Sequence, residues 1–312
     1  MKKKSLIKCP KCHISAPCDP KKLKKKKVCT CPKCKKKFKD PTWGLTVTDA
    51  GAQWKNDEIL NNVNFDITIG CSKAIKNDDY SLSLTNGAKL PIMGKSGTGK
   101  STLMYIIAML KRPLTGRVEW SLFDDSFGWN YEVKRNFSDF RKKHFSFAFQ
   151  DNTLLPHLTV KENLVFHLSH LKKEKEKTEL TENILNKVLL GNEKNDLAKI
   201  LHKHPKELSG GQQQRIALAQ ALITDPTVLF ADEPTGSLDL ITRKQIMKLM
   251  DDWVLNKIYS DQKQRLLIWV THHADDYQLM NVKYILYVSD NCKIQSVEWL
   301  ENYYEMKRKR KE

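Results

Sequence analysis

Short apolar runs flanked by turn or charged residues recur along the chain and predict buried strands. Four of them are KLPIM at 89–93, FSFAF at 145–149, VLFA at 228–231 and LLIWV at 266–270. Such runs, which lack polar alternation, are typical of parallel strands covered on both faces. Two further stretches, VNFDITI and YSLSL, predict strands between residues 45 and 84.

Other segments place apolar residues at every third or fourth position, which predicts amphipathic helices. The clearest are TLMYIIAML after residue 101, the span 159–201 with VKENLVFHL and LTENILNKVLL, and the span 239–255. The charged run KKEKEKTE within the second span is predicted to be a solvated face. The segment 116–143, rich in Asp and aromatic residues, is predicted to be strand and loop without chemistry. Together these elements predict an α/β protein.

The charge is concentrated at the two ends of the chain. The 312 residues carry a formal net charge of +18, but residues 1–40 hold 16 lysines against two aspartates, and residues 307–312 hold five basic residues against one acidic. The remaining body is close to neutral. Basic runs of this kind are most often solvated arms. The alternative function for them is binding to nucleic acid or to anionic lipid.

The sequence predicts neither a membrane span nor a secretory signal. No stretch approaches 18 consecutive apolar residues, and the start, MKKKSLIKCPKC, lacks an apolar signal core. Six of the eight cysteines lie between Cys9 and Cys34. In a chain without an export signal this clustering favours metal over disulfides, and it favours a cytosolic compartment.

Two matched CPKC pairs predict a zinc site. Cys9 and Cys12 form the first pair, and Cys31 and Cys34 form the second after 18 intervening residues. Four thiolates satisfy tetrahedral zinc, and the metal would supply folding energy to a segment with little core of its own. The segment resembles the small zinc ribbons at the N-termini of many bacterial proteins. Its other candidate ligands, Cys18, Cys29 and His13, are interpreted as spectators.

A phosphate-binding loop is predicted after the strand at 89–93. Gly94-Lys95-Ser96-Gly97-Thr98-Gly99-Lys100-Ser101 fits the pattern G-x-x-x-x-G-K-[ST] and leads into a helical run. The glycines allow successive N–H groups to converge on phosphate oxygens at a helix N-terminus. In this pattern Lys100 reaches the β- and γ-phosphates and Ser101 is a Mg²⁺ ligand.

Acidic and neutral polar residues follow the other predicted strands. Asp232 ends the strand at 228–231 and is placed to hold Mg²⁺ through water, and Glu233 is the natural base for an attacking water. His272 follows the strand at 266–270, and Gln150 follows the strand at 145–149. Because open α/β sheets bind ligands at the carboxyl ends of their strands, we expect these residues to share one edge.

The stretch LSGGQQQR at 208–215 predicts a second anion cradle. Ser209 offers a hydroxyl, and Gly210 and Gly211 offer amides with no Cβ in the way, at the start of a helix. About a hundred residues of largely helical sequence separate this cradle from the phosphate loop. We therefore expect two chains to pair head to tail, so that each cradle faces the other chain's phosphate loop across ATP.

In this order the motifs resemble those of the nucleotide-binding subunits of ABC (ATP-binding cassette) transporters, over roughly residues 60–300. The Walker A motif corresponds to 94–101, the Q-loop to Gln150, the signature to 208–212, the Walker B motif to 228–232 with catalytic Glu233, the D-loop to Ser237, Leu238 and Asp239, and the switch histidine to His272. The strings LLPHLTVKENL and FADEPTGSLD are similar to the branch of lipoprotein-releasing, macrolide-exporting and cell-division-associated ATPases.

The resemblance implies a P-loop NTPase of the ABC ATPase type, with a mixed sheet core, an antiparallel β subdomain and a helical subdomain. We accordingly expect a basic zinc ribbon at 1–40, a linker at 41–59, the ATPase domain at 60–300 with its helical subdomain near 151–215, and a basic tail at 301–312. The segment 41–59, which contains Pro41, Gly44 and Gly51, is interpreted as this linker plus the start of the first sheet.

The resemblance also implies the residues of the ATP site. The catalytic set is Glu233, His272, Gln150 and Lys100, and Mg²⁺ is held by Ser101, Gln150 and Asp232. The nucleotide is bound by Gly94, Lys95, Ser96, Gly97, Thr98, Gly99, Lys100, Ser101, Thr102, Gln150 and Asp232, and from the second chain by Ser209, Gly210, Gly211, Gln212 and Asp239.

Two features of the sequence depart from this pattern. The branch usually has Ala-Arg-Ala after the signature, whereas this chain has Gln220 between two alanines, so a habitual helix contact is expected to be lost. The aromatic residue that stacks on adenine is not identified: Trp54 and Phe65 are both candidates.

The leading hypothesis is an ATP-hydrolysing subunit that dimerises around ATP and drives a separate membrane permease, on the cytoplasmic face of the plasma membrane. Export or extraction of lipoprotein is the expected direction, and Leu154, Leu155 and Leu158 are expected to be exposed apolar residues that contact the permease. The alternative is a soluble ABC ATPase that acts on nucleic acid through its zinc ribbon and basic arm. A regulatory scaffold with little turnover is a third reading.

Overall fold

The computed structural model describes most of the chain between residues 43 and 296 and four short strands before it. The described ranges are 5–8, 15–18, 28–30, 37–39, 43–54, 57–70, 75–76, 78–85, 87–122, 125–130, 137–149, 153–169, 173–236, 238–259, 263–273, 275–289, 293–296 and 299. No helix within these ranges is both long and apolar enough to cross a membrane.

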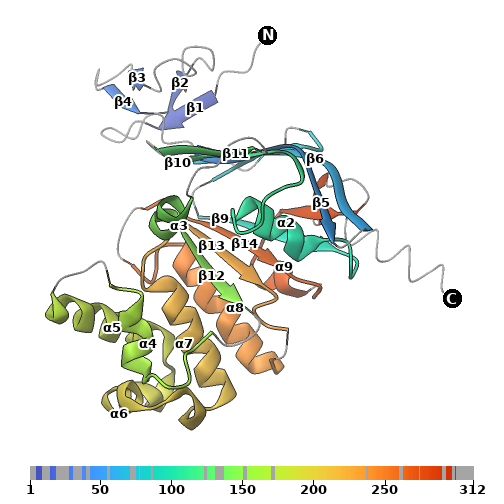
Figure 1. Ribbon diagram of the computed structural model, residues 1–312. Helices are drawn as coiled ribbons and strands as arrows, with labels where there is room; N and C mark the ends of the chain where they lie inside the picture. The colour runs from blue at the N-terminus through green and yellow to red at the C-terminus, as the bar shows by residue number, and fades with distance from the viewer. Residues whose placement is uncertain are drawn as a thin grey trace.

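A parallel sheet forms the centre of the fold (Figure 1). Its strand order is β12-β13-β14-β9-β15-β16, and only β16 runs antiparallel to its neighbour. The strands are β9 (Ala88–Gly94), β12 (Phe145–Phe149), β13 (Val228–Asp232), β14 (Leu266–Val270), β15 (Tyr284–Val288) and β16 (Lys293–Ser296). The predicted strands at 89–93, 145–149, 228–231 and 266–270 are therefore confirmed.

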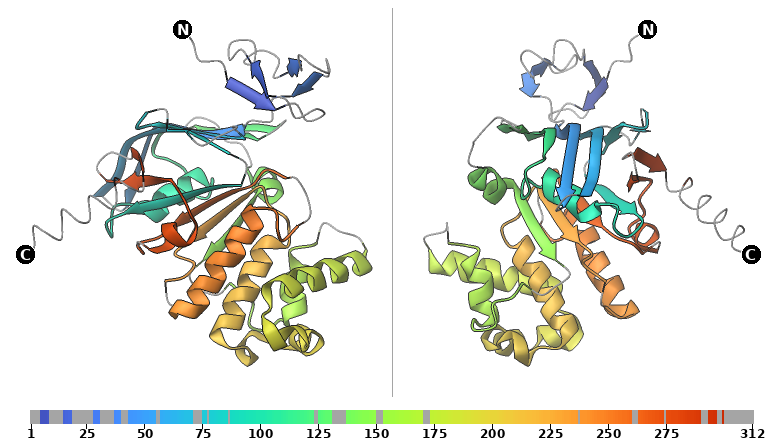
Figure 2. Two further views of the ribbon diagram at one scale, coloured as in Figure 1. Left: turned by 180° about the vertical axis from the view of Figure 1, so that it is seen from behind. Right: turned by 45° about the vertical axis from the view of Figure 1, so that its right-hand side comes forward.

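Both faces of this sheet are covered, which explains why its strands are apolar without alternation. On β13, Val228 and Phe230 pack on the face that holds α2 (Lys100–Ile107), whereas Leu229 and Ala231 pack with α7 (Gly210–Leu222) and α8 (Leu240–Val254). Figure 2 shows α7 and α8 side by side on that second face.

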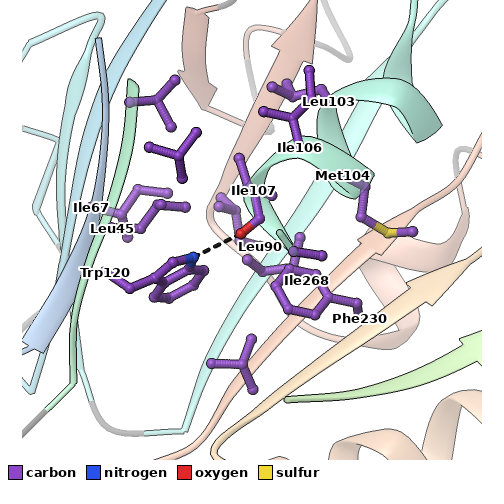
Figure 3. Packing of buried hydrophobic residues seen from close by; sticks show 14 of the residues in the cluster. Leu45, Ile67, Leu90, Leu103, Met104, Ile106, Ile107, Trp120, Phe230 and Ile268 are labelled. Carbon is purple, nitrogen blue, oxygen red and sulfur yellow. Dashed lines mark hydrogen bonds between the residues drawn. The ribbon is translucent and has the colours of Figure 1, made fainter. Parts of the chain in front are cut away.

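A second, largely antiparallel sheet packs above α2, in the order β11-β10-β5-β6-β8-β7. Its strands are β5 (Trp43–Trp54), β6 (Asp57–Ile69), β7 (Ile75–Lys76), β8 (Ser81–Leu84), β10 (Thr115–Leu122) and β11 (Asp125–Asn130). Figure 3 shows the core between the sheets, where Trp120 donates its indole N–H to the carbonyl of Ile107 at 2.7 Å. The hydrogen bond ties β10 to the end of α2.

Most of the segment 41–59, predicted to be a linker plus the start of the first sheet, is sheet, because β5 begins at Trp43. In β5 the side chains of Trp43, Leu45 and Val47 are at most 2% exposed and alternate with outward residues. The glycines that suggested a linker serve close strand approach instead. A Cβ on Gly44 would lie 2.1 Å from the carbonyl oxygen of Ile67 on the paired strand. The sheet that packs on α2 thus begins at Trp43, before the predicted start of the ATPase domain at residue 60.

A helical lobe projects from the end of β12 and confirms the predicted helical pattern (Figure 1). It consists of α4 (Val160–Phe166), α5 (Glu174–Val188), α6 (Leu197–His202) and two short 3₁₀ helices, Gly191–Lys194 and Pro205–Glu207. Helix α4 begins with a capping box, since Thr159 accepts from the Glu162 amide and Glu162 accepts from the Thr159 amide at 2.7 Å.

The expectation that Leu154 is exposed is wrong. Its side chain is 6% exposed and packs in the lobe's own core with Val160 and Leu164, whereas Leu155 and Leu158 are partly exposed. The backbone of Leu155 is held by Asn163, which is fully buried and also donates to the carbonyl of Leu158 at 3.0 Å. The anchoring of this segment by Asn163 turns Leu154 inward.

The other described elements are two short helices and four short strands near the N-terminus. Helix α3 (Ser138–His144) precedes β12, and the short helix α9 (Asp275–Leu279) follows β14. Near the N-terminus, β1 (Ser5–Lys8) pairs with β2 (Ser15–Cys18), and β3 (Val28–Thr30) pairs with β4 (Lys37–Lys39), both antiparallel. The basic tail at 301–312 lies outside the described residues.

Two truncations test the corrected domain boundary. Deleting residues 1–40 keeps β5 intact, and we expect a single cooperative thermal transition by circular dichroism. Deleting residues 1–59 also removes Leu45 and Val47, each of which contributes about 1.5–3 kcal/mol by burial. Because domains have only about 5–15 kcal/mol of stability, the second truncation is expected to lose the cooperative transition. Equal melting temperatures for the two truncations would contradict this boundary.

Candidate functional site

The register of the parallel sheet brings four strand ends to one edge. Phe149 pairs with Asp232, Asp232 pairs with Val270, and Val270 pairs with Ile92. Directly beyond these positions, β12 leads to Gln150, β13 to Glu233, and β14 to Thr271 and His272. Strand β9 leads to the loop that begins at Gly94. The expectation that these motifs share an edge is confirmed by the strand register; Gln150 itself lies outside the described residues.

The loop between β9 and α2 has the backbone of an anion cradle. Gly94, Gly97 and Gly99 have φ of 154°, 79° and 86°, a region that glycine adopts without strain. The loop passes close to its neighbours, because a Cβ on Gly94 would lie 2.3 Å from the carbonyl oxygen of Val288. Gly99 is the N-cap of α2, so the first amides of the helix face the loop.

Lys100 lies inside this loop with its amine directed back at the backbone. Its side chain is buried, and Nζ donates to the carbonyl of Lys95 at 2.8 Å. Burial lowers the pKa of the Lys100 amine, while the negative charges of Glu233 and Asp232 act in the opposite direction. The amine is thus held where the loop would surround a phosphate.

Asp232 is held by two hydroxyl groups from α2. Ser101 donates to Oδ1 at 2.8 Å, and Tyr105 donates to Oδ2 at 2.6 Å. Burial, followed by the contact with Asp232, raises the pKa of the Tyr105 phenol, which keeps it a hydrogen-bond donor. A hydroxyl and a carboxylate side by side at the phosphate loop fit Mg²⁺, which prefers oxygen ligands.

Glu233 and His272 face one another next to this pair. Glu233 has a φ of 46°, which is uncommon for a residue with a side chain, and its amide donates to the carbonyl of Val270 at 3.2 Å. Its Oε1 lies 3.4 Å from Nδ1 of His272. Both side chains are partly exposed, at 29% and 50%, so water has access to the carboxylate. Strained backbone of this kind is common at functional sites.

The second histidine stacks on the first and is less accessible. The rings of His272 and His273 are 4.2 Å apart, and burial lowers the pKa of His273. His272 is thus the more exposed histidine of the pair.

Within a single chain the signature stretch forms a helix start. Ser209 is the N-cap of α7 and makes a capping box with Gln212: Gln212 N–H donates to the Ser209 hydroxyl at 3.3 Å, and Ser209 N–H donates to the Gln212 side chain at 3.0 Å. Ser209 and Gly210 are exposed, and a Cβ on Gly210 would meet no atom within 4 Å. The cradle is therefore open on the side of solvent.

The two cradles pack on different parts of the fold. Helix α2 packs on β9, β13 and β14, whereas α7 packs on α4, α5, α8 and β12. From α7, the Gln214 side chain reaches the edge of the parallel sheet, where it donates to the carbonyls of Phe149 and Pro234, at 3.4 and 3.2 Å. It ties the signature helix to Phe149, which precedes Gln150, and to Pro234, which follows Glu233.

The structure places two other predicted residues, Asp239 and Phe65. Asp239 caps α8, since its Oδ1 accepts from the amides of Ile241 and Thr242, and contacts with Thr242 lower the pKa of its carboxyl. Phe65 is 3% exposed in the core between the sheets, which argues against its stacking on adenine. The side chain of Trp54, like Ser237 of the D-loop, lies outside the described residues.

Some residues of the site were missed at the sequence level. Tyr105 lies four positions after Ser101, on the same helix face, so helical spacing was a usable signal. Gln220, where the branch usually has arginine, accepts from the Thr153 hydroxyl at 2.9 Å and donates to the carbonyl of Asn163 at 3.4 Å. The glutamine thus makes its own contacts with the lobe.

The fold and the site define a P-loop nucleotide-binding protein with a second anion cradle on a separate helix. Residues 77–236 match the family model described as ABC transporter. The chain is similar to the lipoprotein-releasing system ATP-binding protein LolD of Leptospira interrogans, with 36% identity across 74% of this chain and 84% of the relative. It is 39% identical to the LolD protein of Aquifex aeolicus across 54% of this chain and 71% of that relative.

Solved structures agree with the sequence comparison. A dimeric ATP-binding cassette in a post-hydrolysis state, bound to ADP and Pi, has a TM-score of 0.59 and 25% identity, and the match covers 81% of this chain and 98% of the cassette. This chain belongs to the ABC transporter family and is an ATP hydrolase of that family.

Proposed function

We propose that this chain is the ATPase subunit of a membrane export system and that two copies close around ATP. Each phosphate loop would hold the nucleotide through its amides and Lys100, with Ser101, Asp232 and Gln150 around Mg²⁺. When bound, Mg²⁺ would neutralise the charge that develops on the phosphates. Glu233 would polarise the attacking water and His272 would contact the γ-phosphate.

The observation that supports the dimer is that the anion cradle at Ser209, Gly210 and Gly211 is open to solvent. Within one chain, Ser209 and Gly210 face solvent and α7 packs away from the phosphate loop. A second chain in head-to-tail orientation would place Ser209, Gly210, Gly211, Gln212 and Asp239 against the nucleotide. The similarity to a dimeric cassette bound to ADP and Pi supports this arrangement.

The helical lobe is the proposed contact for a permease. Phe166 at the end of α4 is 64% exposed, and Leu155 and Leu158 are partly exposed beside the same helix. The relatives from Leptospira interrogans and Aquifex aeolicus are named for lipoprotein release, which supports extraction of a lipoprotein or a similar amphiphile. The chain would then act on the cytoplasmic face of the membrane through its permease.

Action on nucleic acid remains the alternative. It would depend on the basic ends of the chain, which carry nearly all of the net charge. The names of the matched relatives, which include lipoprotein-releasing and sulfate-import ATP-binding proteins, favour transport over this alternative.

The N-terminal segment is proposed to be a zinc ribbon. Cys9 and Cys12 fall between β1 and β2, Cys31 and Cys34 fall between β3 and β4, and all four lie outside the described residues. Two antiparallel hairpins, each with one cysteine pair between its strands, support a four-thiolate zinc site. Among the described residues there is no cluster of three or more His, Cys, Asp or Glu side chains that could hold a metal ion.

Affinity purification of the full chain from native membranes tests the transport function. A hydrophobic subunit with several membrane spans is expected to co-purify. Phe166→Glu places a charge on the proposed contact and is expected to release that subunit while ATP hydrolysis by the isolated chain persists. Leu255→Glu, at another exposed apolar residue on the far end of α8, is the matched control and should retain it. Recovery of the chain without any membrane protein would contradict the proposal.

Metal analysis tests the zinc ribbon. The purified chain is expected to contain one zinc per molecule, and Cys9→Ser or Cys34→Ser is expected to abolish it, since both remove a thiolate. Cys292→Ser, which changes a cysteine far from the cluster in sequence, is the control and should leave the zinc content intact. Zinc that persists in the Cys9 and Cys34 variants would show that other residues bind it.

A further inference from the structure

A buried ion pair lies behind the proposed catalytic residues. Arg243 on α8 donates from Nε and Nη2 to Oδ1 of Asp276 on α9, at 2.9 and 2.6 Å. Asp276 is fully buried, and the side chain of Arg243 is 9% exposed. Neither residue belongs to a nucleotide-binding motif of the family. Charge-assisted hydrogen bonds of this kind fix geometry strongly.

The other oxygen of Asp276 holds the loop that carries His272. Oδ2 accepts from the hydroxyl of Thr271, and the same hydroxyl oxygen accepts from the amide of His273 at 3.1 Å. The amide of Thr271 donates to the carbonyl of Ile92 on β9 at 3.2 Å. The backbone on both sides of His272 is thus fixed relative to the phosphate-loop strand and to Asp276.

The ion pair also connects this loop to the start of α8. Arg243 follows Asp239 by one helical turn, and its amide donates to the Asp239 carbonyl at 2.9 Å. The Asp239 carboxylate in turn accepts from the Thr242 hydroxyl at 2.6 Å. The first turn of α8 and the loop of His272 are therefore held as one unit.

We propose that Arg243 and Asp276 are positioning residues for ATP hydrolysis, which hold His272 beside Glu233 through the hydroxyl of Thr271. The proposal rests on the roles proposed above for Glu233 and His272. A buried ion pair is weak support for stability, since apolar residues of similar volume often replace it without loss. The contribution that we infer for this ion pair is geometric: Asp276, held by Arg243, fixes the direction of the Thr271 hydroxyl.

Two substitutions at Thr271 test the hydroxyl directly. Thr271→Val keeps the shape and removes the hydrogen bonds, and it is expected to lower kcat roughly ten- to hundred-fold, since small displacements of reacting groups cost rates of this order. KM for ATP is expected to change little, because the hydroxyl of Thr271 bonds to Asp276 and to the amide of His273 and not to a phosphate-binding group. Thr271→Ser keeps the hydroxyl and is expected to restore most of kcat. Equal kcat for the Val and Ser variants would overturn the proposal.

A double substitution separates positioning from stability. Asp276→Leu alone leaves Arg243 buried without its partner and should lower the melting temperature and kcat. Arg243→Met with Asp276→Leu is expected to recover the melting temperature, because no charge is left buried. It should keep the low kcat, because leucine accepts no hydrogen bond from Thr271. Recovery of kcat together with stability would show a purely structural role.

A second ion pair in the same strand region provides the matched control. Arg265, fully buried at the opposite end of β14, donates from Nη2 to Asp225 at 2.6 Å. Asp225→Asn is expected to lower the melting temperature and leave kcat unchanged. A fall in kcat as large as that of Thr271→Val would show that the loss of any buried ion pair in this region lowers kcat, which would contradict a specific positioning role of Asp276.

Glu233→Gln and His272→Ala show whether a negative result contradicts the positioning role of Arg243 and Asp276 or the catalytic roles of Glu233 and His272. If both abolish turnover and the Thr271 and Asp276 variants do not lower kcat, only the inference fails. If either leaves turnover intact, the proposed catalytic roles themselves fail.

Discussion

The register of one parallel sheet is the constraint on which the site depends. Phe149, Asp232, Val270 and Ile92 lie side by side on four neighbouring strands, so every motif that follows them emerges at one edge. A shift of one residue in any strand would turn its side chains to the other face. Both faces are buried, by α2 on one side and by α7 and α8 on the other, so such a shift would have to repack two close-packed cores at once.

The same packing explains why one chain does not complete a nucleotide site. Helix α7 is bound to the lobe, to β12 and to α8, so its first residues open away from the phosphate loop. The polar groups of the signature serve two purposes in this account. Ser209 and Gln212 satisfy the helix start within the chain, and the Ser209 hydroxyl with the amides of Gly210 and Gly211 would serve the nucleotide held by the second chain.

Much of the fold and of the ATP site could be predicted from the sequence, since buried parallel strands and phosphate loops have local signatures. The predictions failed where the signal was not local. Gly44 and Gly51 suggested a linker, whereas Gly44 allows close approach between paired strands. Leu154 was predicted to be exposed, but it packs in the core of the lobe, and the neighbouring Leu155 is held by Asn163 from the next helix, a contact with no local signal. The pairing of Arg243 with Asp276 joins residues 33 positions apart and leaves no sequence pattern.

Subunit mixing tests the shared nucleotide site most directly. One chain carries Lys100→Met, which disables its phosphate loop. The other carries Gly210→Asp, whose Cβ would meet no atom within 4 Å in its own fold and whose carboxylate places a negative charge in the cradle. Each variant alone should be inactive. If each nucleotide is bound by two chains, the mixed dimer has one site with both defects and one with neither, and ATP hydrolysis should appear on mixing. If mixtures at all ratios stay inactive, the account of a nucleotide held between two chains is contradicted.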